Sequence, residues 1–253
     1  MRTGELEKLI RQCLAKFYAR RIAAIESLNL SEVLRRKNPY LFRAKGIGSA
    51  SEMVSELLAA HVSSSDETIF GSEFFEPICK HASKFIIAAA RGSDFVLEAD
   101  DAYQAISLKF GPNAFNSDQV SKLNDRFREM ENSLRATLRT LRKQFVPIMG
   151  CAYGKGNLAP QKSRRYFKLA GQEFWERVTG DSAFYLKLVT FMRDDPDKHR
   201  PAFTEAWDRA VNRFVRDFTC DFCNDAGEIE WERLVAFNSR RPEPQIARKS
   251  SRK

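Results

Sequence analysis

The sequence predicts a mixed α/β fold in which helices flank a central sheet. Residues 94–109 resemble two short strands that meet at a polar turn, Asp100-Asp101. Residues 117–143 then have helical periodicity, and 145–149 form a short apolar run. The order strand, strand, helix, strand, set in a chain that is otherwise mostly helical, favours helices packed against a sheet.

The N-terminal part of the chain is expected to be helical. Apolar residues at helical spacing predict a helix over 5–27. Asn38 precedes a proline, which disfavours the helical backbone, so residues 38–45 are predicted to form an extended link. Capping-box spacing over 49–52 predicts that a second helix covers 53–61.

A polar run over 63–66 predicts the next break in the chain. A strongly apolar helix is expected from 67 towards 90, and Pro77 should kink or divide it because proline removes a backbone donor. Residues 83–89 are the alternative, a first strand of the sheet. Together with the following hairpin, these elements begin the expected core.

The predicted hairpin gathers polar side chains on one face. Ser107 and Lys109 lie two apart on the second strand, and Asp94 opens the first, so pairing would bring all three together. Mg²⁺ prefers hard oxygen ligands and needs only one or two carboxylates, and a nearby lysine stabilises charge on a phosphate. From spacing alone, an exposed ion pair between Asp94 and Lys109 is the plainer interpretation.

The helix predicted over 117–143 has two stripes. Its buried stripe is predicted to consist of Leu134, Leu138 and Leu141. Its cationic stripe consists of Arg135, Arg139 and Arg142. Such a stripe is usually solvated surface, and DNA contact is the alternative.

The C-terminal part combines a basic cluster with further helices. Basic residues interleave with aromatic ones, as suits a phosphate backbone, at Lys162, Arg164, Arg165 and Lys168. Helices are predicted over 172–178, 183–192, 201–223 and 231–237. We divide the chain into a helical segment (1–62), a core (63–160), a helical part packed on the core (161–239) and a basic, disordered tail (240–253).

The composition indicates a globular protein with a polyanionic partner. The net charge is +9 and the pI is near 9.4, which favours nucleic acid. Neither a membrane span nor a signal peptide is apparent, so a cytoplasmic location is expected. The five cysteines suggest no disulfide framework, and Cys220 and Cys223 lack the further ligands that a zinc site needs.

Several stretches together resemble the PmeII-type family of type II restriction endonucleases, within the PD-(D/E)XK nuclease superfamily. They are NPYLFRAK (38–45), SSSDETIFG (63–71), SLKFGPN (107–113), GCAYG (150–154), YFKLAGQEFWE (166–176) and FNS (237–239). The resemblance spans residues 38–239 in the family's order. It implies a restriction-endonuclease-like core and a Mg²⁺-dependent enzyme that cuts double-stranded DNA at a short sequence, with a partner methyltransferase.

The resemblance also implies roles for individual residues. Asp94 would bind the metal, Leu108 would offer its backbone carbonyl, and Lys109 would be the catalytic lysine. Glu67 would be an acid presented by the preceding helix. This chain departs from the superfamily at the second acid position, which is Ser107. The candidates for the missing carboxylate are Glu67 first, and then Glu76, Glu98 and Asp118.

Amides on the Gly-Pro-Asn turn (111–113) and at the start of the following helix suit contacts with phosphates or base edges. They belong to Asn113, Asn116 and Gln119, and helix capping is an equal alternative for Asn116. A homodimer is expected because a palindromic site presents two equivalent strands. Two other functions remain open: a DNA-binding protein with a decayed, inactive nuclease core, and a basic structural or RNA-binding protein.

Overall fold

A computed structural model describes the chain over residues 3–82, 86–87, 93–109, 111, 117–193 and 195–241. The chain divides into two compact units. Unit 1 comprises residues 1–21 and 65–201, and unit 2 comprises residues 22–64 and 202–253. The boundaries fall within three helices, α1 (Thr3–Glu26), α4 (Ala50–Phe70) and α9 (Asp195–Phe222). The contiguous four-part division expected from the sequence stays a prediction.

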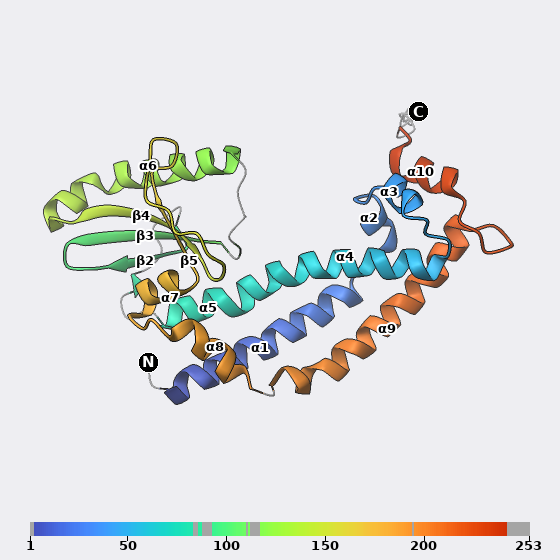
Figure 1. The fold of residues 1–253 in the computed structure, drawn as a ribbon, viewed down its shortest axis with the longest axis horizontal. Helices are drawn as coiled ribbons and strands as arrows, with labels where there is room; N and C mark the ends of the chain where they lie inside the picture. The colour runs from blue at the N-terminus through green and yellow to red at the C-terminus, as the bar shows by residue number, and fades with distance from the viewer. Residues whose placement is uncertain are drawn as a thin grey trace, which may run out of the picture. The chain divides into compact units, whose positions relative to one another are not determined.

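A mixed sheet forms the centre of unit 1, which confirms the predicted fold class (Figure 1). Within the described residues its strands are β1 (Ile86–Ile87), β2 (Phe95–Glu98), β3 (Ala102–Lys109), β4 (Gln144–Cys151) and β5 (Phe167–Ala170), in that spatial order. The first three pair antiparallel, and β3, β4 and β5 pair parallel. The hairpin of β2 and β3 is as predicted, and β1 confirms the alternative of a strand within 83–89.

Helices cover both faces of this sheet. On one face Leu97, Ile106 and Leu108 pack in a core with residues of α1, α5 (Glu76–Ala82), α7 (Gln172–Thr179) and α8 (Phe184–Met192). On the other face Ala105 and Met149 pack against α6 (Ser117–Leu141). Because strand side chains alternate, the odd-numbered residues of β3, including Ser107 and Lys109, belong to the α6 face.

Unit 2 is helical over its described residues. Its helices are α2 (Leu30–Leu34), α3 (Pro39–Ala44), α10 (Trp231–Ser239) and the parts of α1, α4 and α9 that fall within it. Two buried clusters hold it together, one around Leu57 and Phe218 and one around Ile25 and Ala210. Its interior is therefore apolar.

Two predictions of non-helical segments in the N-terminal half were wrong. The predicted link over 38–45 is the helix α3: Asn38 is extended, as a residue before proline should be, but its side chain caps the helix and Pro39 opens it. The polar run over 63–66 does not interrupt α4, which continues to Phe70. A capped helix of this length tolerates serines in its interior because its buried apolar face decides its stability.

The helix expected from 67 towards 90 is divided, although not at Pro77 itself. A π-helical segment, η1 (Gly71–Phe75), joins α4 to α5. Proline cannot donate the hydrogen bond that the preceding turn would need, and the Glu76 amide donates instead to the Gly71 carbonyl. Residues 83–85 and 88–90 lie outside the described part of the chain.

The C-terminal predictions hold with three corrections. Strand β5 was not predicted, because Phe167–Ala170 is short and begins inside the basic cluster. Helix α9 begins at Asp195, so Pro201 lies inside it and not at its start. Leu141 is 47% exposed and does not continue the buried stripe of α6, whereas Leu138 is buried.

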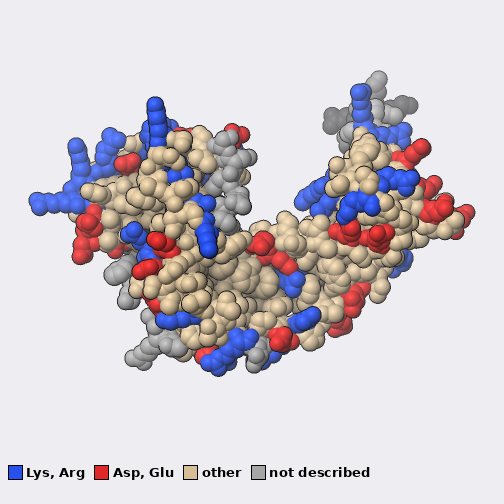
Figure 2. All heavy atoms as spheres, viewed as in Figure 1, with Lys and Arg blue, Asp and Glu red and all other residues tan. Residues whose placement is uncertain are grey.

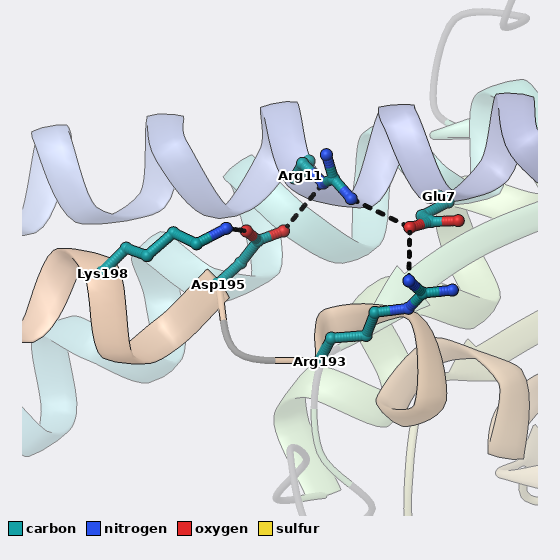
Figure 3. Close-up of polar contacts among 5 residues, drawn as sticks. All are labelled: Glu7, Arg11, Arg193, Asp195 and Lys198. Carbon is teal, nitrogen blue, oxygen red and sulfur yellow. Dashed lines mark hydrogen bonds and ion pairs between the residues drawn. The ribbon is translucent and has the colours of Figure 1, made fainter.

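A network of charges joins α1 to the beginning of α9 within unit 1 (Figure 3). Asp195 is buried, and its carboxylate forms ion pairs with Arg11 at 3.1 Å and Lys198 at 2.7 Å. Glu7 forms ion pairs with Arg11 at 2.9 Å and Arg193 at 3.4 Å. The Lys198 hydrogen bond is the main cause of the lowered pKa of Asp195.

No helix in the part of the chain described here is both long and apolar enough to cross a lipid bilayer.

Candidate active site at the end of strand β3

The residues with the strongest predicted roles meet where β3 ends. Phe95 pairs with Ile106, which places Asp94 beside Ser107 at the start of β2. The Asp94 amide donates to the Ile106 carbonyl at 2.9 Å, continuing the strand pairing by one bond. The Leu108 amide then donates to the Asp94 carboxylate, Oδ2, at 2.6 Å. Although Asp94 is exposed, its carboxylate is thereby fixed against β3.

The backbone of Leu108 faces the same side as Asp94. In a strand the N–H and the carbonyl of one residue point the same way, so the Leu108 carbonyl projects towards the β2 side, as its amide does. Lys109 faces the other strand, since its carbonyl accepts from the Ala152 amide at 3.3 Å. The Asp94 carboxylate and the Leu108 carbonyl therefore offer hard oxygen atoms at the C-terminal end of β3, which we call the edge of the sheet.

Two lysines reach the same region on the α6 face. Lys109 pairs in register with Cys151, and Lys168 of β5 with Met149. Burial raises the pKa of the Cys151 thiol, and the charges of Lys168 and Lys109 oppose that rise. The sequence assigned Lys168 to DNA binding and Lys109 to catalysis, and the structure brings both near Cys151.

Ser107 is buried, at 5% exposure, between these strands. Its side chain lies on the face shared by Asp94 and Lys109, at the position where the resemblance noted in the sequence implies an acid. A neutral hydroxyl is a poor ligand for Mg²⁺, so a carboxylate at this edge has to come from another element.

Glu67 reaches the edge from α4 through a tyrosine. The Tyr153 hydroxyl, just beyond β4, donates to the Glu67 carboxylate, Oε2, at 3.0 Å. A Cβ on Gly111, two residues after Lys109, would meet that hydroxyl at 2.9 Å. Burial first, and then Glu67, raises the pKa of Tyr153, so the phenol stays protonated as a donor.

The other three acids considered for the missing position differ in place. Glu76 and Asp94 both raise the pKa of Cys79, after its burial, which places the two carboxylates around one buried thiol. Glu98 lies at the other end of the hairpin, where it receives Lys143 at 2.5 Å. Asp118 is exposed in the first turn of α6. Glu67 is therefore the acid that a hydrogen bond ties to this end of the sheet, whereas Glu76 is paired with Lys80 on its own helix.

The donor set suits a magnesium ion that keeps most of its water. Among the described residues, no three His, Cys, Asp or Glu side chains gather as a metal cluster. Mg²⁺ does not require one, because it binds through one or two carboxylates and retains several waters. Asp94, the Leu108 carbonyl and one helix acid meet that requirement in their chemistry.

The basic cluster at 162–168 is held to α6 beside the sheet. The Asn124 side chain donates to the Ser163 carbonyl at 3.0 Å and accepts from the Arg165 amide at 2.9 Å. Lys162 and Arg165 are exposed, and Arg164 donates to the Ala159 carbonyl at 2.7 Å. The segment is thus held in place, and its exposed cations, Lys162 and Arg165, are accessible to a polyanion.

The arginine stripe of α6 lies at the other end of the sheet. Arg135 and Arg139 are exposed beside Gln144, where β4 begins, and Figure 2 shows Lys and Arg gathered over this end of α6. Gln144 pairs with Ala102, the first residue of β3, about 23 Å from Lys109 at the usual strand rise. The structure does not bring these arginines to the candidate catalytic edge.

The turn after β3 is described in part. Gln119 is exposed in the first turn of α6. Asn113 and Asn116 lie outside the described residues. Their predicted roles in DNA binding therefore stay predictions.

Tyr153 and the position of Lys168 were missed from the sequence. Tyr153 follows a buried strand and precedes Gly154. An aromatic residue just after the end of a strand is a weak indication of a functional position there. Lys168 was predicted only as a member of the basic cluster, because β5 was not predicted. The available signal was its two-residue spacing from the buried Tyr166 and Ala170, which is typical of one face of a strand.

Comparison with known proteins gives one family. Residues 4–200 match the family model described as "Type II restriction endonuclease EcoO109I". This range covers most of the chain and includes every candidate catalytic residue. No curated protein sequence matches the chain.

Proposed function

We propose that this chain, which belongs to the type II restriction endonuclease EcoO109I family, is a Mg²⁺-dependent enzyme that hydrolyses double-stranded DNA at a short specific sequence. The observation that carries the proposal is the Asp94 carboxylate bonded to the Leu108 amide, next to Lys109 at the end of β3. The family supports a DNA endonuclease in general. Metal dependence, the site residues and the narrower PmeII-type assignment are our proposals.

The edge supplies the groups that phosphodiester hydrolysis needs. Asp94 and the Leu108 carbonyl would hold Mg²⁺, which when bound lowers the pKa of a water molecule and offsets charge on the phosphate. Lys109, on the same face as Asp94, would orient the attacking water and stabilise the developing charge. Ser107 is buried and uncharged, so its role would be confined to packing and hydrogen bonding.

Glu67 is our first choice for the carboxylate that Ser107 does not provide. Its hydrogen bond to Tyr153 holds it beside Gly111, two residues from Lys109. Glu76 is the second choice, because it shares the surroundings of Cys79 with Asp94. Replacing each by glutamine and measuring Mg²⁺ affinity decides between them: the variant that binds the metal less tightly identifies the ligand.

DNA would be bound by cations on several elements. Lys168 lies close to the catalytic edge, and the loop carrying Lys162 and Arg165 is held beside it. We further propose a homodimer, since a palindromic site presents equivalent strands to a two-fold partner, and a cognate methyltransferase that protects the host sequence.

The direct experiment is digestion of sequenced, unmethylated phage DNA by the full chain with Mg²⁺. Discrete fragments whose ends share one short sequence would support the proposal, and chelation of the metal should stop the reaction. Folded protein that leaves diverse unmethylated DNA intact, with Asp94→Ala binding Mg²⁺ as well as the wild type does, would refute it.

A second function, DNA binding by a decayed nuclease, is favoured by one observation. Ser107 occupies the acid position, and no cluster of three or more metal-ligating side chains forms among the described residues. This function predicts duplex binding that does not depend on Mg²⁺ and gives no product. Binding measured with and without Mg²⁺ on the DNA used for digestion separates the two functions.

A further inference from the structure

Tyr153 links the helix that carries Glu67 to the end of the sheet. Its hydroxyl donates to Oε2 of Glu67 at 3.0 Å, and within the described residues this is the hydrogen bond that Glu67 makes. Glu67 is itself exposed on α4, where a glutamate side chain ordinarily samples several rotamers. The phenol selects among those rotamers.

The space around the hydroxyl is closely matched to it. A Cβ at Gly111 would lie 2.9 Å from the Tyr153 Oη and 3.5 Å from its Cζ. The φ of Gly111 is not in the left-handed region, so its backbone does not demand glycine. What glycine supplies at this position is room for the phenol.

The backbone of Tyr153 is tied to Lys109 through the preceding residue. The Ala152 amide donates to the Lys109 carbonyl at 3.3 Å, and the Ala152 carbonyl accepts from the buried Trp175 indole at 2.7 Å. The ring of Tyr153 also lies 6.3 Å from that of Phe75. The hydroxyl is therefore carried by a segment whose position is fixed relative to β3.

We propose that Tyr153 is a positioning residue that holds the Glu67 carboxylate at the metal-binding edge, an inference that rests on the proposed function. The hydrogen bond engages Oε2, so Oε1 would be the oxygen left for the metal or one of its waters. Groups that orient a metal ligand in this way typically change metal affinity by 10–100-fold. Because Tyr153 is 41% exposed, we expect the lower end of that range, about tenfold.

The first test replaces Tyr153 by phenylalanine and measures Mg²⁺ binding to the full chain, without DNA, by isothermal titration calorimetry. We expect about tenfold weaker Mg²⁺ binding, unchanged affinity for a DNA duplex, and cleavage restored by raising Mg²⁺. Tyr185→Phe is the matched control, since Tyr185 is a tyrosine of similar exposure, 37%, on α8. The control should bind Mg²⁺ as the wild type does.

The second test reaches the same hydroxyl from the opposite side. Gly111→Ala should push the Tyr153 hydroxyl away from Glu67 and weaken Mg²⁺ binding by a similar factor. In the Tyr153→Phe background the new methyl group occupies space that the lost hydroxyl leaves, so the double variant should be no worse than Tyr153→Phe alone. Additive losses would mean that Gly111 acts independently of the hydroxyl and would overturn the proposal.

The outcomes separate this inference from the proposed function. If the wild type cuts DNA and Tyr153→Phe binds Mg²⁺ unchanged, the positioning role is wrong and the nuclease function stands. Equal losses in Tyr153→Phe and Tyr185→Phe would also overturn the role, because the effect would not be specific to the edge. A wild type that neither binds Mg²⁺ nor cuts DNA overturns both.

Discussion

The two ends of the sheet in unit 1 hold their charged side chains in different ways. At the end of β3, the Asp94 carboxylate accepts a hydrogen bond from a backbone amide, and Glu67 accepts one from Tyr153, which follows the anchored Ala152. At the other end, Arg135 and Arg139 project from an exposed face of α6. Chemistry on a phosphate requires fixed groups, whereas general attraction to DNA requires only charge.

Substitution of Asp94 should have the largest effect and tests the difference between the two ends of the sheet most clearly. Asp94→Asn keeps an oxygen that accepts from the Leu108 amide but removes the negative charge, so the strand edge should persist while Mg²⁺ binding and cleavage are lost. We expect a loss on the order of 10³-fold in single-turnover cleavage. Asp100→Asn, at the exposed hairpin turn, is the matched control. Cleavage by Asp94→Asn at the control's rate would exclude Asp94 from the site.

The next largest effect is expected from a substitution in the packing beneath the candidate catalytic edge. Gly150 pairs with Leu108, and a Cβ on it would lie 2.3 Å from Phe174, which is fully buried. Gly150→Ala should lower the free energy of unfolding by about 1–3 kcal/mol, because the ring cannot move freely. Chemical denaturation measures it, and Gly48→Ala, where a Cβ meets nothing within 4 Å, should stay close to wild type. Equal stability in both variants would contradict this packing.

Removing the two arginines of α6 tests the other end of the sheet. Arg135→Gln with Arg139→Gln should weaken binding of all duplexes alike and reduce the salt slope by about 2, since each phosphate contact contributes close to 1. The single-turnover rate at saturating protein should not change. Lys8 and Lys16, exposed on α1 across the sheet, provide a charge-matched control. A selective loss of cleavage would mean that the arginines act in the chemistry.

The buried Asp195 predicts a smaller, pH-dependent effect. Its pKa is lowered, mainly by the hydrogen bond from Lys198, so its stabilising contribution is present above its ordinary pKa of 3.8. That contribution is lost as the pH falls through the lower pKa of the folded protein. Thermal unfolding of Asp195→Asn should therefore differ from wild type at neutral pH and converge with it in acid. A difference that persists in acid would point to packing instead.

The hairpin was predictable because its signals are local. Asp100 and Asp101 mark the turn, and the alternation along β3 fixes which face carries Ser107 and Lys109. The breaks were misjudged where two rules compete: Asn38 precedes a proline, yet it also caps a helix that the proline begins. Serines over 63–65 favour turns in isolation, but α4 continues because its buried residues decide.

The site was predictable only in the part that one hairpin provides. Asp94 and Lys109 meet through local pairing, whereas the approach of Glu67 to Tyr153 joins residues 86 apart in sequence. No local pattern encodes that contact. The position of Lys168 was not predicted for the same reason, since it depends on β5 pairing with β4.

The most direct test compares cleavage and binding on one duplex for Lys109→Met. If the end of β3 performs the chemistry, the single-turnover rate should fall by at least about 100-fold. The affinity for the same duplex should change little, and the salt slope by no more than about 1. A variant that cuts at the wild-type rate once bound, but has lost its affinity for DNA, would make Lys109 a binding residue and contradict the account.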